Sequence, residues 1–121
     1  MTTVLLVSDR SSVIDRVHAR LSSPEISVID HHDPETAADV AYSRQVDSVL
    51  VDMQVGSMGA MAVTRSVRAK AQGDDPVPVT ILLDREADAF LAKRSGAENW
   101  VAKNASAERL RAAVTADTAD R

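Results

Sequence analysis

The chain has 121 residues, no cysteine, a net charge of −4 and a pI near 5.2. This length suits one domain with a core of its own, and the core must be aliphatic because aromatic residues make up only 2% of the chain. The acidic balance and the absence of any Lys/Arg block exclude a nucleic-acid or basic membrane-binding surface, and the lack of cysteine excludes disulfides and cysteine-based metal sites.

The first half of the chain predicts three strands and two helices. The first helix carries Val13, Val17 and Leu21 at the spacing of one helix face. The second starts at Asp33-Pro34, because Asp suits the N-cap and Pro the first helical position. In chain order we expect a strand over 4–7, a helix over 11–21, a strand over 26–29, a helix from 33 to about 44 and a strand over 46–51.

The second half continues the same alternation. Gly96 follows a helical segment at a position typical of a left-handed C-cap, and Ser106 is the expected cap of the last helix. The stretch QGDDPVP breaks the chain before the fourth strand. We expect a helix over 58–71, a strand over 77–83, a helix over 86–95, a strand over 100–102, a helix from 106, and a polar tail over 115–121 that frays.

Five strands alternating with five helices predict an α/β fold. Such alternation is typical of a doubly wound parallel sheet with helices on both faces, and continuous apolar strands fit a sheet that is covered on both sides. No linker or repeat divides the chain, so residues 1–121 form one domain. The longest apolar runs are far too short to cross a membrane and no secretory signal is visible, so we expect a cytoplasmic protein.

Polar residues gather where the predicted strands end. In an open parallel sheet, ligands bind at the carboxyl ends of the strands, and these ends share one edge. Asp52 closes an apolar strand; as a lone residue it would suggest only the cap of a turn. The other strand ends carry Ser8-Asp9-Arg10, Leu83-Asp84-Arg85 and Lys103-Asn104, so three acids and a lysine are predicted to converge.

Three segments in this order resemble those of a response-regulator receiver domain of two-component signalling. VLLVSDR resembles the first strand with its acidic pair, DSVLVDMQVGSMGAMAV the phosphoacceptor strand and its loop, and RSGAENWVAK the segment that leads to the family's lysine. The resemblance covers nearly the whole chain. It implies a five-stranded parallel sheet in the order 2-1-3-4-5, the flavodoxin-like receiver fold.

The resemblance also implies a role for each matching residue. Asp52 would be the nucleophile that accepts a phosphoryl group from a histidine kinase or small phosphodonor. Asp9, Asp52 and the backbone carbonyl of Gln54 would hold Mg²⁺, and Lys103 would contact a phosphoryl oxygen. These roles agree with the chemistry, because phosphoryl transfer depends on positioning and on neutralising oxygen charge.

Several residues depart from the family pattern at this site. Ser8 replaces the first acid, which touches Mg²⁺ through water. Its hydroxyl can still hold that water, but one negative charge is gone, so we expect Ser8 to be a weak metal contact and metal affinity to fall. Leu83 replaces the Thr or Ser whose hydroxyl bonds the phosphoryl group. Without that hydroxyl, a hydrogen bond to the phosphoryl group worth roughly 1.5–3 kcal/mol is missing. Trp100 occupies the aromatic switch position and has lost that hydroxyl partner, so we expect weak switching.

Two further departures concern the loops around the lysine. Asp84 replaces a small residue, and it is either an extra charge beside the phosphoryl pocket or, more commonly for Asp, the cap of the following helix. Arg85 follows it as a second modulator. Asn104 replaces the proline after Lys103, so the family's cis peptide is expected to be lost.

The leading hypothesis is an atypical stand-alone receiver that accepts phosphate at Asp52 and acts by binding a partner protein. The alternative is a phosphorylation-independent pseudo-receiver, which Ser8, Leu83 and Asn104 favour. The chain has no Gly-rich phosphate loop and no catalytic His or Cys, so we expect no enzyme activity beyond self-catalysed transfer to, and hydrolysis from, Asp52. The resemblance places the partner or homodimer surface on the fourth helix, fifth strand and fifth helix, with Phe90, Lys93, Arg94, Trp100, Arg109 and Arg111.

Overall fold

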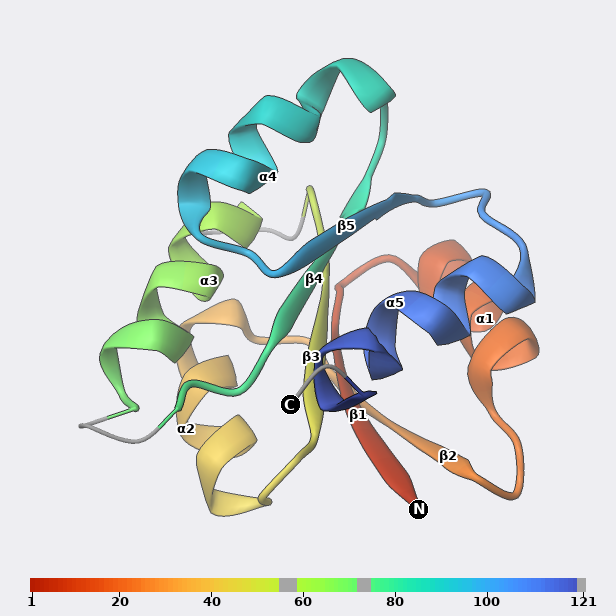
Figure 1. The fold of residues 1–121 in the computed structure, drawn as a ribbon, viewed down its shortest axis with the longest axis horizontal. Helices are drawn as coiled ribbons and strands as arrows, with labels where there is room; N and C mark the ends of the chain where they lie inside the picture. Colours follow the sequence, from red (N-terminus) through yellow and green to blue (C-terminus); the bar gives the residue numbers. More distant parts are fainter. Residues whose placement is uncertain (55–58, 72–74, 120–121) are drawn as a thin grey trace.

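Five strands form one parallel sheet in a computed structural model that describes residues 1–54, 59–71 and 75–119 (Figure 1). The strand order is β2-β1-β3-β4-β5, which confirms the predicted topology. The central strands are the most deeply buried, because helices cover both faces of the sheet. The strands are β1 (Thr2–Val7), β2 (Ile26–His31), β3 (Ser48–Asp52), β4 (Val79–Leu83) and β5 (Asn99–Ala102).

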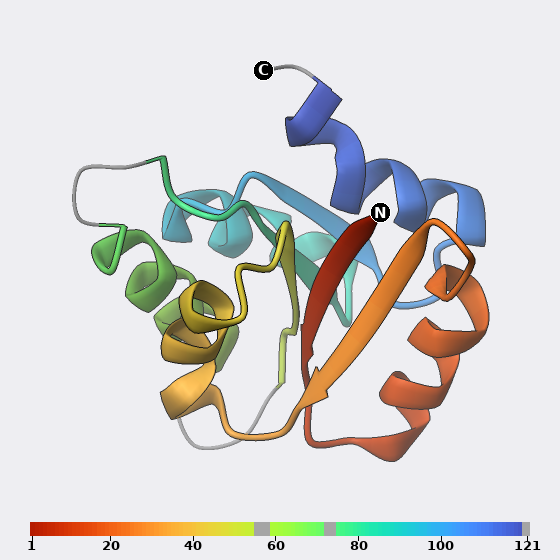
Figure 2. The same cartoon turned by 90° about the horizontal axis from the view of Figure 1, so that it is seen from below.

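The helices divide into two layers around the sheet (Figure 2). One face is covered by α1 (Ser11–Leu21) and α5 (Ala107–Ala119). The other face is covered by α2 (Ala37–Ser43), α3 (Gly59–Ala69) and α4 (Ala89–Ser95), with short 3-10 helices at Pro34–Thr36 and Glu86–Asp88. Within the described ranges, no helix combines the length and apolarity needed to cross a membrane.

The strands bury aliphatic side chains on both faces. Successive residues of a strand point to opposite sides, so Leu50 joins the cluster under α1 and α5, while Val49 and Val51 join the cluster under α2, α3 and α4. This alternation explains why the strands read as continuous apolar runs in the sequence. It also means that Asp52, two residues after Leu50, lies on the side of α1 and α5.

The predicted end signals of the helices are confirmed. The carboxylate of Asp33 accepts a hydrogen bond from the Glu35 amide, and the Ser106 hydroxyl accepts one from the Arg109 amide. Gly96 ends α4 with a φ of 90°, in the left-handed region that favours glycine. All peptide bonds of the described residues are trans, as expected for the bond after Lys103.

Several predicted boundaries were wrong, and hydrogen bonds explain two of them. The amide of Val46 bonds the Ala41 carbonyl and closes α2, so β3 starts at Ser48. The amide of Val77 bonds the Tyr42 hydroxyl instead of a neighbouring strand, so β4 starts at Val79.

Two further helix ends were predicted from the sequence. The expected start of the third helix at Met58 lies outside the described residues. At the carboxyl end, α5 continues to Ala119, where we expected a frayed tail over 115–121. The hydroxyl of Thr115 donates a hydrogen bond to the Arg111 carbonyl at 2.8 Å within this helix, and fraying of the tail stays a prediction.

The register of the sheet decides which residues meet at its carboxyl edge. Val7 pairs with Val51 in the β1–β3 ladder, which sets Ser8 beside Asp52. Leu83 pairs with Ala102 in the β4–β5 ladder, which sets the next residues, Asp84 and Lys103, side by side. The ladder pattern therefore brings two pairs of polar side chains to one end of the sheet.

Truncation of a fully buried strand residue should test this core. Leu50→Ala removes a side chain with no solvent exposure, and the free energy of unfolding should fall by about 2–5 kcal/mol. Phe90→Ala is the control, because Phe90 is 58% exposed and should change stability by no more than about 0.5 kcal/mol. Urea unfolding followed by circular dichroism measures both, and equal losses in the two variants would contradict the assignment.

Candidate functional site

The centre of the candidate site is the carboxylate of Asp52, which has no solvent exposure. Its Oδ1 accepts from Arg10 Nη2 at 2.7 Å and from the Gln54 amide at 3.1 Å, and it lies 3.0 Å from Lys103 Nζ. Its Oδ2 accepts from Arg10 Nε at 3.0 Å and from Ser8 Oγ at 3.0 Å. Five donor atoms thus surround one buried carboxylate, which is how proteins make a buried charge tolerable.

The turn from β1 into α1 supplies Ser8 and Arg10. Ser8 is fully buried, and its hydroxyl accepts a hydrogen bond from the Arg10 amide while donating to Asp52. Arg10 is the N-cap residue of α1, and its carbonyl accepts from the amides of Val13 and Ile14. The backbone of Arg10 is therefore fixed at both its amide and its carbonyl, so its guanidinium reaches Asp52 from a defined position.

The loops after β4 and β5 supply Asp84 and Lys103. The amide of Lys103 bonds the Leu83 carbonyl, which continues the β4–β5 ladder by one residue, and the Lys103 ammonium pairs with both Asp52 and Asp84. The carboxylate of Asp84 also lies 3.5 Å from Arg10 Nη2. We favoured Asp84 as a helix cap from sequence. The structure places its carboxylate beside two cations, Lys103 and Arg10, and the helix-cap role stays a prediction.

The charges at this site shift two ionisation equilibria. Hydrogen bonding to Asp52 raises the pKa of the Arg10 guanidinium against the opposing effect of burial, and the charges of Asp52, Asp84 and Asp9 add to the rise. Burial raises the pKa of the Asp84 carboxyl, which Arg10 opposes and the Asp52 charge reinforces. Arg10 thus stays a cation at any physiological pH.

Three further predicted site residues, Asp9, Gln54 and Arg85, differ in how they interact with the site. Asp9 is exposed at the end of β1, close enough for its charge to act on Arg10. Gln54 reaches Asp52 through its amide, whereas the sequence pointed to its carbonyl. Arg85 is 76% exposed and pairs with Asp88 at 3.3 Å, and it acts on the site through its charge, which opposes the rise in the pKa of Asp84.

The donors around Asp52 do not fit a divalent metal in this arrangement. Mg²⁺ requires about six oxygen ligands at roughly 2.0–2.1 Å in octahedral geometry. Both oxygens of Asp52 already accept hydrogen bonds from Arg10, so an ion bonded to either oxygen would lie against a guanidinium of like charge. Among the described residues, no group of three or more His, Cys, Asp or Glu side chains is arranged to hold a metal.

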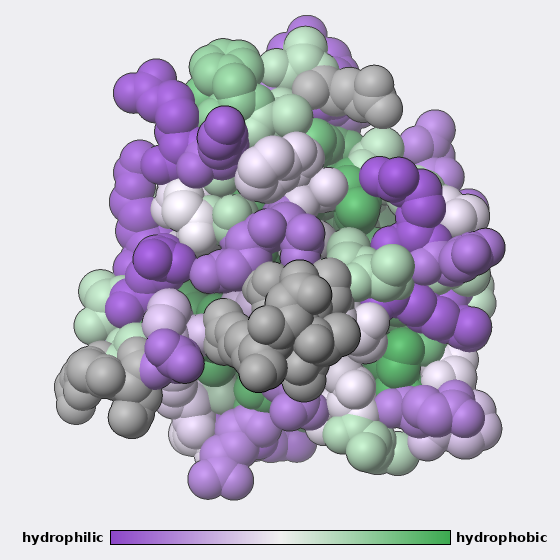
Figure 3. Space-filling view, in the orientation of Figure 1, coloured by the Kyte–Doolittle hydropathy of each residue, from purple (hydrophilic) through white to green (hydrophobic). Residues whose placement is uncertain are grey.

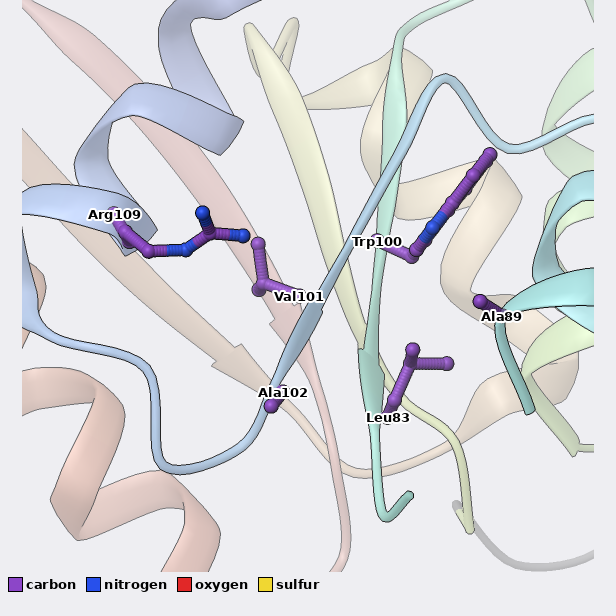
Figure 4. A pocket seen from close by; sticks show the side chains of 6 residues that line it. All are labelled: Leu83, Ala89, Trp100, Val101, Ala102 and Arg109. Carbon is purple, nitrogen blue, oxygen red and sulfur yellow. The ribbon is translucent and has the colours of Figure 1, made fainter. Parts of the chain in front are cut away.

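The two predicted switch residues, Leu83 and Trp100, pack in or against the hydrophobic core. Leu83 is 2% exposed and sits in the core cluster under α4, and Trp100 is partly buried against the same cluster. Figure 4 shows Trp100 beside Ala89 on one side of β5 and Arg109 on the other side. They line a pocket of about 280 Å³ together with other residues of β4, α4, β5 and α5. The lining residues are Leu83, Ala89, Trp100, Val101, Ala102 and Arg109.

Five of the six residues of the predicted partner surface are exposed. Phe90, Lys93 and Arg94 are exposed on α4, and Arg109 and Arg111 are exposed on α5. Figure 3 shows this face covered largely by hydrophilic side chains, with smaller apolar patches between them. The surface is therefore accessible in the monomer and mixed in polarity, with its basic residues on both helices.

Sequence reasoning missed Arg10 as a site residue. The sequence did place Arg10 near Asp52, because Arg10 follows the first strand and Asp52 ends the third, at the same edge of the sheet. No spacing rule, however, says whether the residue after an acidic-pair position turns inward. Arg10, which makes two charged hydrogen bonds to Asp52 at 2.7 and 3.0 Å, was therefore found only in the structure.

Comparisons with known proteins agree with this fold. The sequence model of the response regulator receiver domain matches residues 4–115. A candidate response regulator from Chloroflexus aurantiacus superposes with a TM-score of 0.85 at 19% identity, over 98% of each chain. The receiver domain of sensor histidine kinase PA1611 from Pseudomonas aeruginosa, solved with magnesium in its active-site cleft, has a TM-score of 0.79 at 22% identity, over 95% of each chain.

A chemotaxis protein is a third similar structure. The response regulator CheY4 of Vibrio cholerae has a TM-score of 0.77 at 23% identity, over 92% of this chain and 93% of that one. At such identities, these neighbours establish the fold.

A double-mutant cycle should measure the coupling of Arg10 to Asp52. With Arg10→Ala, Asp52→Ala and the double variant, we expect a coupling of at least about 1.5 kcal/mol, because two charged hydrogen bonds to a buried carboxylate are lost together. The matched pair Arg85 and Asp88 should couple by only about 0.2–1 kcal/mol, since Arg85 is largely exposed. Urea denaturation gives both values, and similar couplings would show that burial of Asp52 does not strengthen its ion pair.

Proposed function

Because the chain belongs to the response regulator receiver domain family, we propose that it is a two-component signalling module that binds a protein partner without phosphorylation of Asp52. One observation carries this proposal. Both oxygens of Asp52 are covered by donors from Ser8, Arg10, Gln54 and Lys103, and the carboxylate has no solvent exposure. The carboxylate that would be the nucleophile is engaged in holding the site together.

A carboxylate attacks phosphorus through an oxygen lone pair. An ionised carboxylate offers about four lone-pair positions, and five donor atoms already surround Asp52. An incoming phosphoryl group would have to displace at least one of them, and Arg10 covers both oxygens at once. Releasing Arg10 means breaking two charged hydrogen bonds, each worth roughly 1.5–3 kcal/mol.

The apolar residue at the end of β4 supports the same proposal. Leu83 is 2% exposed and belongs to the core cluster, so it fills space without offering a donor. Trp100 packs partly buried against this cluster and next to Leu83 in the pocket. A signal at Asp52 therefore has no hydroxyl through which to pull the β4 loop, and the coupling between site and surface is weakened at its first step.

A second candidate function is phosphoacceptance at Asp52, and the position of Lys103 favours it. The Lys103 ammonium lies 3.0 Å from Asp52 Oδ1, where it would neutralise an oxygen of a transferred phosphoryl group. In this candidate, a histidine kinase or small phosphodonor delivers the phosphoryl group. The weak Mg²⁺ site predicted from sequence would exist only after Arg10 had moved away from Asp52.

Both candidates act through a partner surface on α4, β5 and α5. We place a downstream protein, or a second copy of the chain, on the side bearing Phe90 and Arg109, within the cytoplasm. The exposed side chains of α4 and α5 support this assignment, and Phe90 is the large apolar residue that they surround. No turnover of a separate substrate forms part of the proposal.

Intact mass spectrometry after incubation with a small phosphodonor and Mg²⁺ tests the proposed function. We expect no phosphoryl adduct on the wild-type chain, because Arg10 and Lys103 cover the Asp52 oxygens. A receiver domain that has the two acids and the Thr or Ser of the family pattern serves as the positive control for donor activity.

The same experiment on Asp52→Ala decides between the two candidates. An adduct on the wild-type chain that is missing in this variant would overturn the proposal and establish phosphoacceptance at Asp52. An adduct present in both would place the modification on another residue, which would leave Asp52 unmodified as proposed.

A further inference from the structure

Arg10 occupies a position that helix stability does not explain. It is the N-cap of α1, where Ser, Thr, Asp and Asn are preferred, and it makes no side-chain cap bond. The first turn of α1 contains no acid, and a cation at the positive end of the helix dipole is unfavourable. Local sequence rules therefore oppose an arginine here, and its contribution must come from what the guanidinium contacts.

Within the described part of the chain, the guanidinium of Arg10 pairs with two acids of the site, Asp52 and Asp84. It donates two hydrogen bonds to the Asp52 carboxylate, at 2.7 and 3.0 Å, and lies 3.5 Å from the Asp84 carboxylate. Its side chain is 38% exposed, so it closes the site from the solvent side while Asp52 stays fully buried. We propose that Arg10 replaces the divalent cation as the counter-ion of Asp52, and that its removal turns the same pocket into a divalent-cation site.

The charges of the pocket support this exchange. Asp52 and Asp84 are balanced by Arg10 and Lys103, so an added divalent ion would bring a surplus of positive charge. Without Arg10, the same two carboxylates, Asp52 and Asp84, face one ammonium, that of Lys103. Carboxylate oxygens are the ligands that Mg²⁺ and Mn²⁺ prefer, and the space left by the guanidinium adjoins both oxygens of Asp52.

Titration with Mn²⁺ and Mg²⁺ tests the inference. We expect Arg10→Ala to bind Mn²⁺ at least about tenfold more tightly than the wild-type chain, because a like charge beside the ligands has been removed. Free Mn²⁺ measured by electron paramagnetic resonance reports binding directly. A metal-dependent rise of the melting temperature in Arg10→Ala, absent from the wild type, is the second readout.

Two control variants separate the role of Arg10 from general charge effects. Arg85→Ala removes the same charge from the same edge of the sheet; Arg85 pairs with Asp88 and acts on Asp84 through its charge alone, so metal affinity should change far less than in Arg10→Ala. The double variant Arg10→Ala/Asp52→Asn should lose the gained affinity, because it removes the ligand that Arg10 uncovers. If Arg10→Ala fails to fold without metal, Arg10→Gln keeps part of the side-chain volume without the charge and serves in its place.

Each outcome decides the inference. Mn²⁺ binding by the wild type as tight as by Arg10→Ala or Arg10→Gln would overturn it, as would an equal gain in Arg85→Ala. The inference does not depend on the proposed function. A phosphoryl adduct on the wild type would refute a phosphorylation-independent module while the metal titration could still show that Arg10 is the counter-ion.

Discussion

The candidate site depends on the burial of one negative charge. Asp52 ends the central strand β3 with no solvent exposure, and a carboxylate in that position is stable only when charges and hydrogen bonds replace water. Ser8, Arg10, Gln54 and Lys103 provide this replacement from three different strand ends. The β1–α1 turn and the loops after β3 and β5 are held together by their common interaction with Asp52.

The parallel register converts this requirement into geometry. Pairing of Val7 with Val51 sets Ser8 beside Asp52, and pairing of Leu83 with Ala102 sets Asp84 beside Lys103. Because the carboxyl ends of parallel strands share one edge, residues far apart in the chain meet there without a long loop. Asp84 then extends the network, as its carboxylate holds the Lys103 ammonium and lies near Arg10.

A counter-ion that belongs to the protein has consequences for signalling. A metal ion can leave and return, whereas Arg10 is tethered by its own backbone bonds to Ser8 and to the first turn of α1. Its charge is permanent, and its planar fork matches a carboxylate in two hydrogen bonds. Together with Leu83 in place of a hydroxyl donor, this arrangement favours one stable state of the site over a switch between two.

The sequence by itself determined the fold and the residues at the edge of the sheet. Apolar runs with periods of two and 3.6 residues, together with caps such as Asp33 and Gly96, were enough because they depend on local physics. Resemblance to a known family then assigned roles to Asp52 and Lys103. Boundaries at Val46 and Val77 were missed because their amides bond groups elsewhere in the chain, which no local pattern records.

Only the tertiary structure decided how the charges pair. The sequence showed three acids and a lysine at one edge, but the direction of the Arg10 side chain and the partners of Asp84 depend on distances between separate strand ends. Electrostatic energy varies steeply with such distances and with burial, so residue type alone could not tell a helix cap from an ion pair. The fold followed from local patterns, and the counter-ion of Asp52 from the packing of the whole sheet.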